Sequence, residues 1–140
     1  RIMLFLRKLD HSAIYVLIAG TYTPICLHFF SGFWAWGMLI IIWSLALIGV
    51  LVKLFIINAP RWFTAAVYLG MGWLSLLLVK PLLHQLGWGA IAWLLAGGLA
   101  YSVGVVFYVS ERSPHHHAIW HLFVMGGSAC HFVTVLLYVA

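Results

Sequence analysis

The chain has 140 residues, of which 66% are hydrophobic and only 6% are Asp, Glu, Lys or Arg, and its mean hydropathy is +1.13. A soluble domain devotes about a quarter of its residues to those charged types, so this composition excludes a water-soluble surface. The formal net charge is +5, but the basic residues are scattered between apolar runs and form no nucleic-acid-binding patch, so no nucleic-acid partner is expected. We therefore expect an integral membrane protein with lipid as its main solvent.

Five apolar segments follow one another, each with about the 20 residues needed to cross a hydrocarbon core about 30 Å thick. The segments are continuously apolar, with no polar alternation, which favours helices over a β-barrel. The short connections leave no room for an extramembrane domain. The sequence predicts an all-α polytopic transmembrane helical bundle, a single domain over residues 1–140, with spans at residues 10–30, 34–56, 64–83, 91–109 and 117–139.

Two local features of the spans carry further expectations. Ala96, Ala100 and Gly104 fall at four-residue spacing, which predicts a stripe of small residues where a neighbouring helix approaches closely. Pro24 lies inside the first span, so it is expected to kink this helix or to end its regular hydrogen bonding.

Positively charged residues are unequally divided between the two sides of the expected membrane. Lys80 alone falls on one side. The side where the first span begins has six, namely Arg1, Arg7, Lys8, Lys53, Arg61 and Arg112. Because Lys and Arg are enriched in cytoplasmic loops, we expect the first span to begin in the cytoplasm.

The last span opens with three consecutive histidines followed by His121. His117 and His121 are four residues apart, so on a helix their side chains lie on one face about one turn apart, where two imidazoles can bind one metal ion. A second interpretation is a cluster of interfacial histidines solvated by lipid headgroups. The spacing alone leaves both interpretations open.

Asp10 opens the first span in a chain with only one other acidic residue. A carboxylate at this position is either a functional group or a helix N-cap paired with Arg7 or Lys8. The first and last spans start on the same side, so Asp10 is expected in one cytoplasmic layer with the histidine pair. Two histidines and a carboxylate suit Zn²⁺, with Asp10 orienting or deprotonating a metal-activated water that attacks a carbonyl.

A third protein ligand is missing from this set. His131 lies about 15 Å along the helix from His121 and on another face. His11 points away from the face of Asp10, and His28 and His84 fall near the opposite membrane surface. We expect these four histidines to be packing, interfacial or hydrogen-bonded residues.

Three segments resemble the haemolysin III family, the bacterial branch of the progestin and adipoQ receptors. They are RKLDHSAIYVLIAGTYTP at 7–24, IWSLALIG at 42–49, and HAIWHLFV at 117–124, the last followed by GGS at 126–128 and HF at 131–132. Members of this family have seven spans. The resemblance therefore implies that the chain corresponds to spans three to seven and that two upstream spans are missing, in agreement with the absence of an initiator Met.

The resemblance also implies a zinc site and the residues that form it. In the family, two ligands come from H-x-x-x-H in the last span, which corresponds to His117 and His121, and an Asp near the zinc corresponds to Asp10. A third ligand comes from an S-x-x-x-H motif, which would lie upstream of Arg1 and has no counterpart here. This chain alone is therefore expected to hold zinc weakly or not at all.

The family groups with alkaline ceramidases, which implies a zinc-dependent hydrolase of a lipid amide or ester. A membrane lipid is the expected substrate or ligand, and the metal site is expected toward the cytoplasmic side of the bacterial inner (plasma) membrane. Two alternatives remain: a pore-forming haemolytic protein, and a ligand-responsive membrane receptor with structural zinc. Dependence of activity on the histidines separates hydrolase from pore, and product formation separates hydrolase from receptor.

Overall fold

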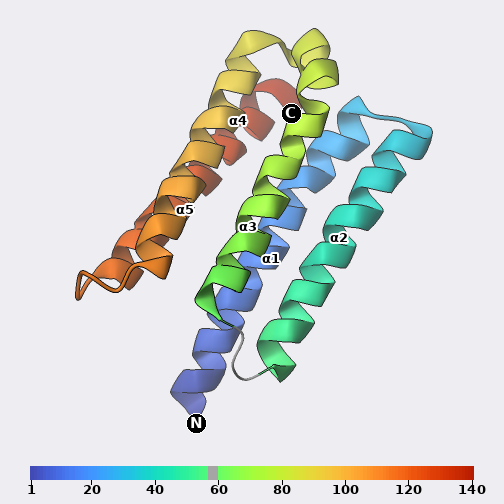
Figure 1. Cartoon of the computed structure of the whole chain (residues 1–140). Helices are drawn as coiled ribbons and strands as arrows, with labels where there is room; N and C mark the ends of the chain where they lie inside the picture. Colours follow the sequence, from blue (N-terminus) through green and yellow to red (C-terminus); the bar gives the residue numbers. More distant parts are fainter. Residues whose placement is uncertain (57–59) are drawn as a thin grey trace. The chain divides into compact units, whose positions relative to one another are not determined.

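The computed structural model describes residues 1–56 and 60–140, and residues 57–59, between the second and third expected spans, lie outside this description. Every secondary-structure element in the described part is helical, which confirms the all-α prediction (Figure 1). The elements are α1 (Ile2–Phe29), α2 (Gly32–Phe55), α3 (Arg61–Trp73), the 3₁₀-helix η1 (Leu74–Leu78), α4 (Val79–Val109), α5 (His116–Thr134) and the π-helix η2 (Val135–Val139). They divide into two compact units, Arg1–Met71 and Gly72–Ala140.

Four helical stretches of the described chain are long and apolar enough to cross a membrane: Ile2–Phe29, Gly32–Phe55, Arg61–Val109 and His116–Val139. The third stretch has 49 residues, about twice the length that one crossing needs. It is interrupted at Gly87, whose φ of 77° and ψ of −179° are not helical. Glycine adopts this conformation readily because it has no Cβ. One hydrogen bond joins the segments before and after this break, from Trp73 Nε1 to Ser102 Oγ at 3.0 Å. The chain thus reverses at Gly87, and the 49-residue stretch divides into two arms, each long enough for one of the predicted crossings.

In the first unit, α1 and α2 form an antiparallel pair (Figure 1). Buried side chains on α1 recur every three or four residues, as expected for one face of a helix. Gly49 on α2 provides room for the ring of Tyr15, which is 2% exposed, and a Cβ at Gly49 would overlap that ring. Small residues allow the two backbones to approach closely, so the pair is held by shape as well as by apolar contact.

Two tyrosines attach α3 to α1 within the same unit. Tyr22 Oη on α1 donates to the carbonyl of Met71 on α3 at 2.7 Å. In the reverse direction, Tyr68 Oη on α3 donates to the carbonyl of His11 on α1, also at 2.7 Å. Both tyrosines are buried, so each hydrogen bond satisfies a polar group that lipid cannot solvate.

Pro24 does not end α1, which continues to Phe29. Proline cannot donate the backbone hydrogen bond of its turn, so the regular ladder lacks one bond there. Two threonines just before it donate side-chain hydrogen bonds to carbonyls one turn earlier, Thr21 Oγ1 to Leu17 O at 2.9 Å and Thr23 Oγ1 to Ala19 O at 3.0 Å. The span is therefore continuous across the proline.

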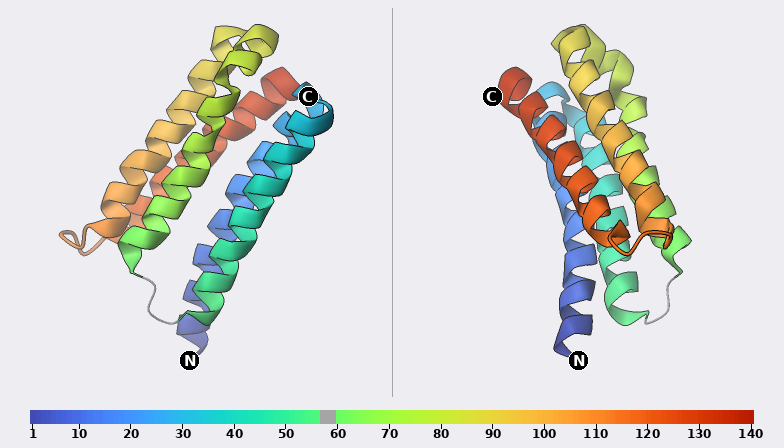
Figure 2. Two further views of the ribbon diagram at one scale, coloured as in Figure 1. Left: turned by 45° about the vertical axis from the view of Figure 1, so that its right-hand side comes forward. Right: turned by 90° about the vertical axis from the view of Figure 1, so that its left-hand side faces the viewer.

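In the second unit, α4 and α5 run antiparallel and pack along one another (Figure 2). The predicted small-residue stripe is partly wrong, because Ala96 is exposed and Ala100 only half-buried. The close approach occurs at Gly97 and Gly104, where an added Cβ would overlap His131 and Phe123 of α5. A spacing of seven residues stays on one helix face better than two steps of four, since two turns contain 7.2 residues.

Candidate metal centre

The N-terminus of α5 places both histidines of the H-x-x-x-H pair in its first two turns. The residues before it form a turn in which His116 N donates to Ser113 O at 3.2 Å, and His116 Nδ1 lies 2.7 Å from the same carbonyl. Ile119 N then donates to His115 O at 3.0 Å. This turn fixes the residue at which the helix begins, and therefore the positions of His117 and His121 along it.

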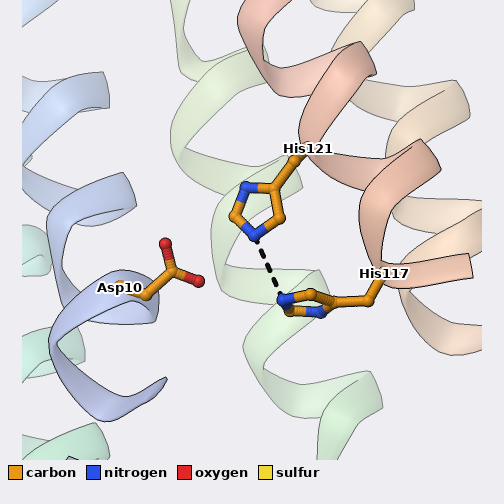
Figure 3. Close-up of side chains that lie close together, drawn as sticks. All are labelled: Asp10, His117 and His121. Atoms are coloured by element: carbon orange, nitrogen blue, oxygen red, sulfur yellow. Dashed lines mark hydrogen bonds between the residues drawn. The ribbon is translucent and has the colours of Figure 1, made fainter. Parts of the chain in front are cut away.

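The side chains of His117 and His121 face one another on consecutive turns of α5 (Figure 3). Their Nε2 atoms are 3.1 Å apart, and one ring nitrogen donates to the other. The ring centroids are 4.7 Å apart with an angle of 81° between the planes. Two nitrogens bound to one tetrahedral zinc, each at about 2.0–2.1 Å, are separated by roughly 3.3 Å. The pair therefore has the donor atoms and the spacing of one edge of a zinc tetrahedron.

Trp120 lies between the two histidines in the sequence and fixes them against α4. It is 1% exposed, and its ring centroid lies 4.7 Å from that of His121 and 5.4 Å from that of His117. It also packs on Tyr108 of α4, with the ring centroids 4.6 Å apart. His117 itself is exposed and His121 half-buried, while the tryptophan between them is buried. No role was predicted for Trp120 from the sequence, although a large aromatic residue between the two histidines could have indicated that it packs against them.

Asp10 belongs to the first unit and lies on α1 (Figure 3). The helix begins at Ile2 with Arg1 as N-cap, so the alternative interpretation of Asp10 as the N-terminal cap is wrong. Its side chain is 40% exposed, with Oδ2 3.9 Å from His11 Nδ1. Sequence reasoning misplaced the helix start because the charged residues before Asp10 were taken as extramembrane, whereas the helix includes them.

His11 and His131 have the packing and hydrogen-bonding roles that were expected for them. His11 is 5% exposed, and its Nδ1 lies 2.7 Å from the carbonyl of Arg7, to which it donates. His131 lies far along α5, where its Nε2 is 3.3 Å from Leu94 O and its ring is 5.4 Å from that of Tyr101. His28 and His84 are both exposed.

The apolar helices and the histidine pair define an all-α integral membrane protein with a candidate metal centre at the start of its last helix. The chain belongs to the haemolysin-III related family, whose model matches residues 1–132.

Among curated proteins, the chain is 50% identical over 133 residues to "Hemolysin-3 homolog" of Bacillus subtilis (strain 168), covering 95% of this chain and 62% of the relative. It is 50% identical over 131 residues to "Hemolysin-3" of Bacillus cereus, covering 94% and 60% respectively. A more distant relative is human "Monocyte to macrophage differentiation factor", 33% identical over 130 residues, covering 92% of the chain and 53% of the relative. The chain thus spans about 60% of the length of the two Bacillus relatives. No solved structure matches it.

Proposed function

We propose that this chain supplies two of the zinc ligands of a membrane hydrolase that acts on a lipid amide or ester. The observation that carries the proposal is the 3.1 Å separation of the two Nε2 atoms at the start of α5. Membership of the haemolysin-III related family supports it, because the resemblance of the 7–24 and 117–132 segments to that family implies the same zinc ligands. The proposal assigns metal binding to His117 and His121.

Asp10 is proposed as the carboxylate of the same site. The sequence predicts three spans between the first and the last, and because this number is odd, both are expected to start on the same side of the membrane. The bias of positive charge assigns this side to the cytoplasm, and the bacterial relatives support the plasma membrane as its location.

The residues divide the proposed chemistry between them. Zinc, when bound, would acidify a water molecule and polarise the carbonyl of the lipid. His117 and His121 would hold the ion through Nε2, and Trp120 packs against both rings and restricts their movement. Asp10, with 40% of its side chain exposed, can accept the proton of the attacking water or orient that water by a hydrogen bond. The remaining ligand is proposed to come from an S-x-x-x-H segment upstream of Arg1.

The test is lipid hydrolysis by a chimera that carries the two upstream spans of the Bacillus subtilis relative in front of Arg1. Reconstituted in vesicles that contain ceramide-like lipids, the chimera should release fatty acid. His117→Ala, His121→Ala and Asp10→Asn should abolish the release, and His84→Ala, which changes an exposed histidine elsewhere, should not. Equal release by the His117→Ala variant would overturn the hydrolase. Zinc binding without any release would favour the receptor alternative.

The second candidate function is lysis, because both Bacillus relatives are named for haemolysis. A pore needs a polar lining, and the spans of this chain have few polar residues in any periodic stripe. Leakage of a dye from the same vesicles separates the two functions. Leakage that persists in the His117→Ala variant, with no lipid product, would support lysis.

A further inference from the structure

The first unit concentrates positive charge at one end. It contains five of the seven Lys and Arg residues of the chain, and its only acidic residue is Asp10. Three of the five come from three different helices: Lys8 from α1, Lys53 from the last turn of α2, and Arg61 from the first turn of α3. We call these three residues the basic triad.

Contacts within the unit bring the members of the basic triad to the same end. Lys8 Nζ donates to the carbonyl of Leu54 at 2.9 Å, which joins the early turns of α1 to the last turn of α2 next to Lys53. The hydrogen bond between Tyr68 and the His11 carbonyl fixes α3 against α1. Arg61 lies seven residues before Tyr68, about 10 Å closer to this end of the unit.

Large exposed aromatic side chains lie within three residues of each member of the basic triad in the sequence. Phe5 on α1, Phe55 on α2 and Trp62 on α3 have exposed fractions of 57%, 75% and 65%. Tryptophan, the residue type of Trp62, is enriched at the headgroup level of a bilayer. A free phosphate ion would contact only the cations, whereas a phospholipid would place its phosphate on the cations and its acyl chains along the apolar side chains.

We propose that the basic triad binds the phosphate headgroup of an anionic glycerophospholipid. The positive-inside rule accounts for basic residues on one side of the membrane. It does not require three different helices to bring them to the same place. Convergence of cations between transmembrane helices is the arrangement that recognises anionic headgroups. The proposal rests on the first unit alone and is independent of the metal centre.

The test is native mass spectrometry of the whole 140-residue chain in detergent, titrated with phosphatidylglycerol or phosphatidylcholine of the same acyl chains. Phosphatidylglycerol should bind more tightly than phosphatidylcholine. Each charge removed from the triad should weaken its binding about fivefold, which corresponds to about 1 kcal/mol. The Lys53→Gln/Arg61→Gln variant should therefore lose roughly 25-fold in affinity for phosphatidylglycerol while its affinity for phosphatidylcholine is unchanged.

Four controls make the result specific. Lys80→Gln/Arg112→Gln removes the same charge outside the triad and should keep the preference. Lys53→Arg retains the charge, so this variant should retain the preference for phosphatidylglycerol. Arg61→Gln changes an exposed residue, so it should show the fivefold loss without a risk to folding. Inorganic phosphate at millimolar concentration should not displace the lipid.

Equal affinity for the two lipids would overturn the proposal. An equal loss in the Lys80→Gln/Arg112→Gln variant would overturn it too, because the effect would then follow net charge. Displacement by inorganic phosphate would assign the triad to a free anion instead of a lipid.

Discussion

His117 Nε2 and His121 Nε2 lie 3.1 Å apart on consecutive turns of α5, and the buried Trp120 packs against both rings. The pair needs no rearrangement of the helix to present two nitrogens to one ion. Trp120 packs in turn on Tyr108 of α4, so the described ring contacts connect the pair to the neighbouring helix of the same unit.

The close approach of α4 and α5 at Gly97 should not tolerate a side chain. Gly97→Ala would place a Cβ against the imidazole of His131 and 3.1 Å from the carbonyl of Gly127, and we expect a loss of about 1–3 kcal/mol in stability. Thermal unfolding in detergent measures it. The neighbouring Gly98→Ala is the matched control, since its Cβ would make only ordinary contact with Trp73 at 3.8 Å. Equal melting temperatures for the two variants would contradict the packing described.

The reversal at Gly87 should require glycine. Its φ of 77° combined with a ψ of −179° is open essentially to glycine alone, so Gly87→Ala is expected to cost about 1–3 kcal/mol. Gly20→Ala serves as control, because a Cβ at this helical position meets nothing within 4 Å and alanine is the better helix former. Thermal unfolding should show a lower midpoint for the first variant only. If Gly87→Ala unfolds at the parent temperature, the reversal is not at this residue.

The tyrosine links between α1 and α3 should be separable by removing single hydroxyls. Tyr68→Phe leaves the His11 carbonyl without the 2.7 Å hydrogen bond, and Tyr22→Phe does the same to the Met71 carbonyl. Each should lower stability by about 1–2 kcal/mol, because these groups are buried from water. The measurement is again thermal unfolding in detergent, with Tyr138→Phe as comparison. A neutral Tyr68→Phe would contradict the packing of α3 on α1.

Membrane orientation can be tested with cysteine labelling in intact cells. After replacement of Cys26 and Cys130 by Ala, Gln85→Cys should react with a membrane-impermeant thiol reagent, whereas Ser110→Cys should react only after the cells are broken. The expectation follows from the excess of positive charge on the side of residue 110. The opposite pattern would place the histidine pair outside the cytoplasm.

The helices could be predicted from the sequence because apolar length and short connections leave few other solutions in lipid. Helix starts were predicted less well. The sequence placed the first span at Asp10, but Arg7 and Lys8 are part of α1, and Lys8 reaches the carbonyl of Leu54 across 46 positions of sequence. Long basic side chains can lie along a helix and direct their charge to the interface, so charge alone does not mark a helix start.

The site could be predicted as far as local spacing determines it. His117 and His121 are four residues apart, and the helix brings them together as expected. The contact of Trp120 with Tyr108 depends on how α4 and α5 pack, and no periodicity in the sequence specifies that pairing. For the same reason, the close approach of α4 and α5 includes Gly104 as predicted, but its other member is Gly97 and not Ala96 or Ala100. That Asp10 and an upstream histidine join the pair remains a prediction from the family resemblance.

Zinc content by mass spectrometry tests the central claim most directly. It would be measured on the purified 140-residue chain, on the chimera with two upstream spans, and on a His117→Ala/His121→Ala variant of each. We predict about one zinc per chain in the chimera, little in the shorter chain, and none in either variant. If the chimera holds no zinc, or if its double variant holds as much as the parent, the histidine pair is not a metal site and its residues are interfacial histidines.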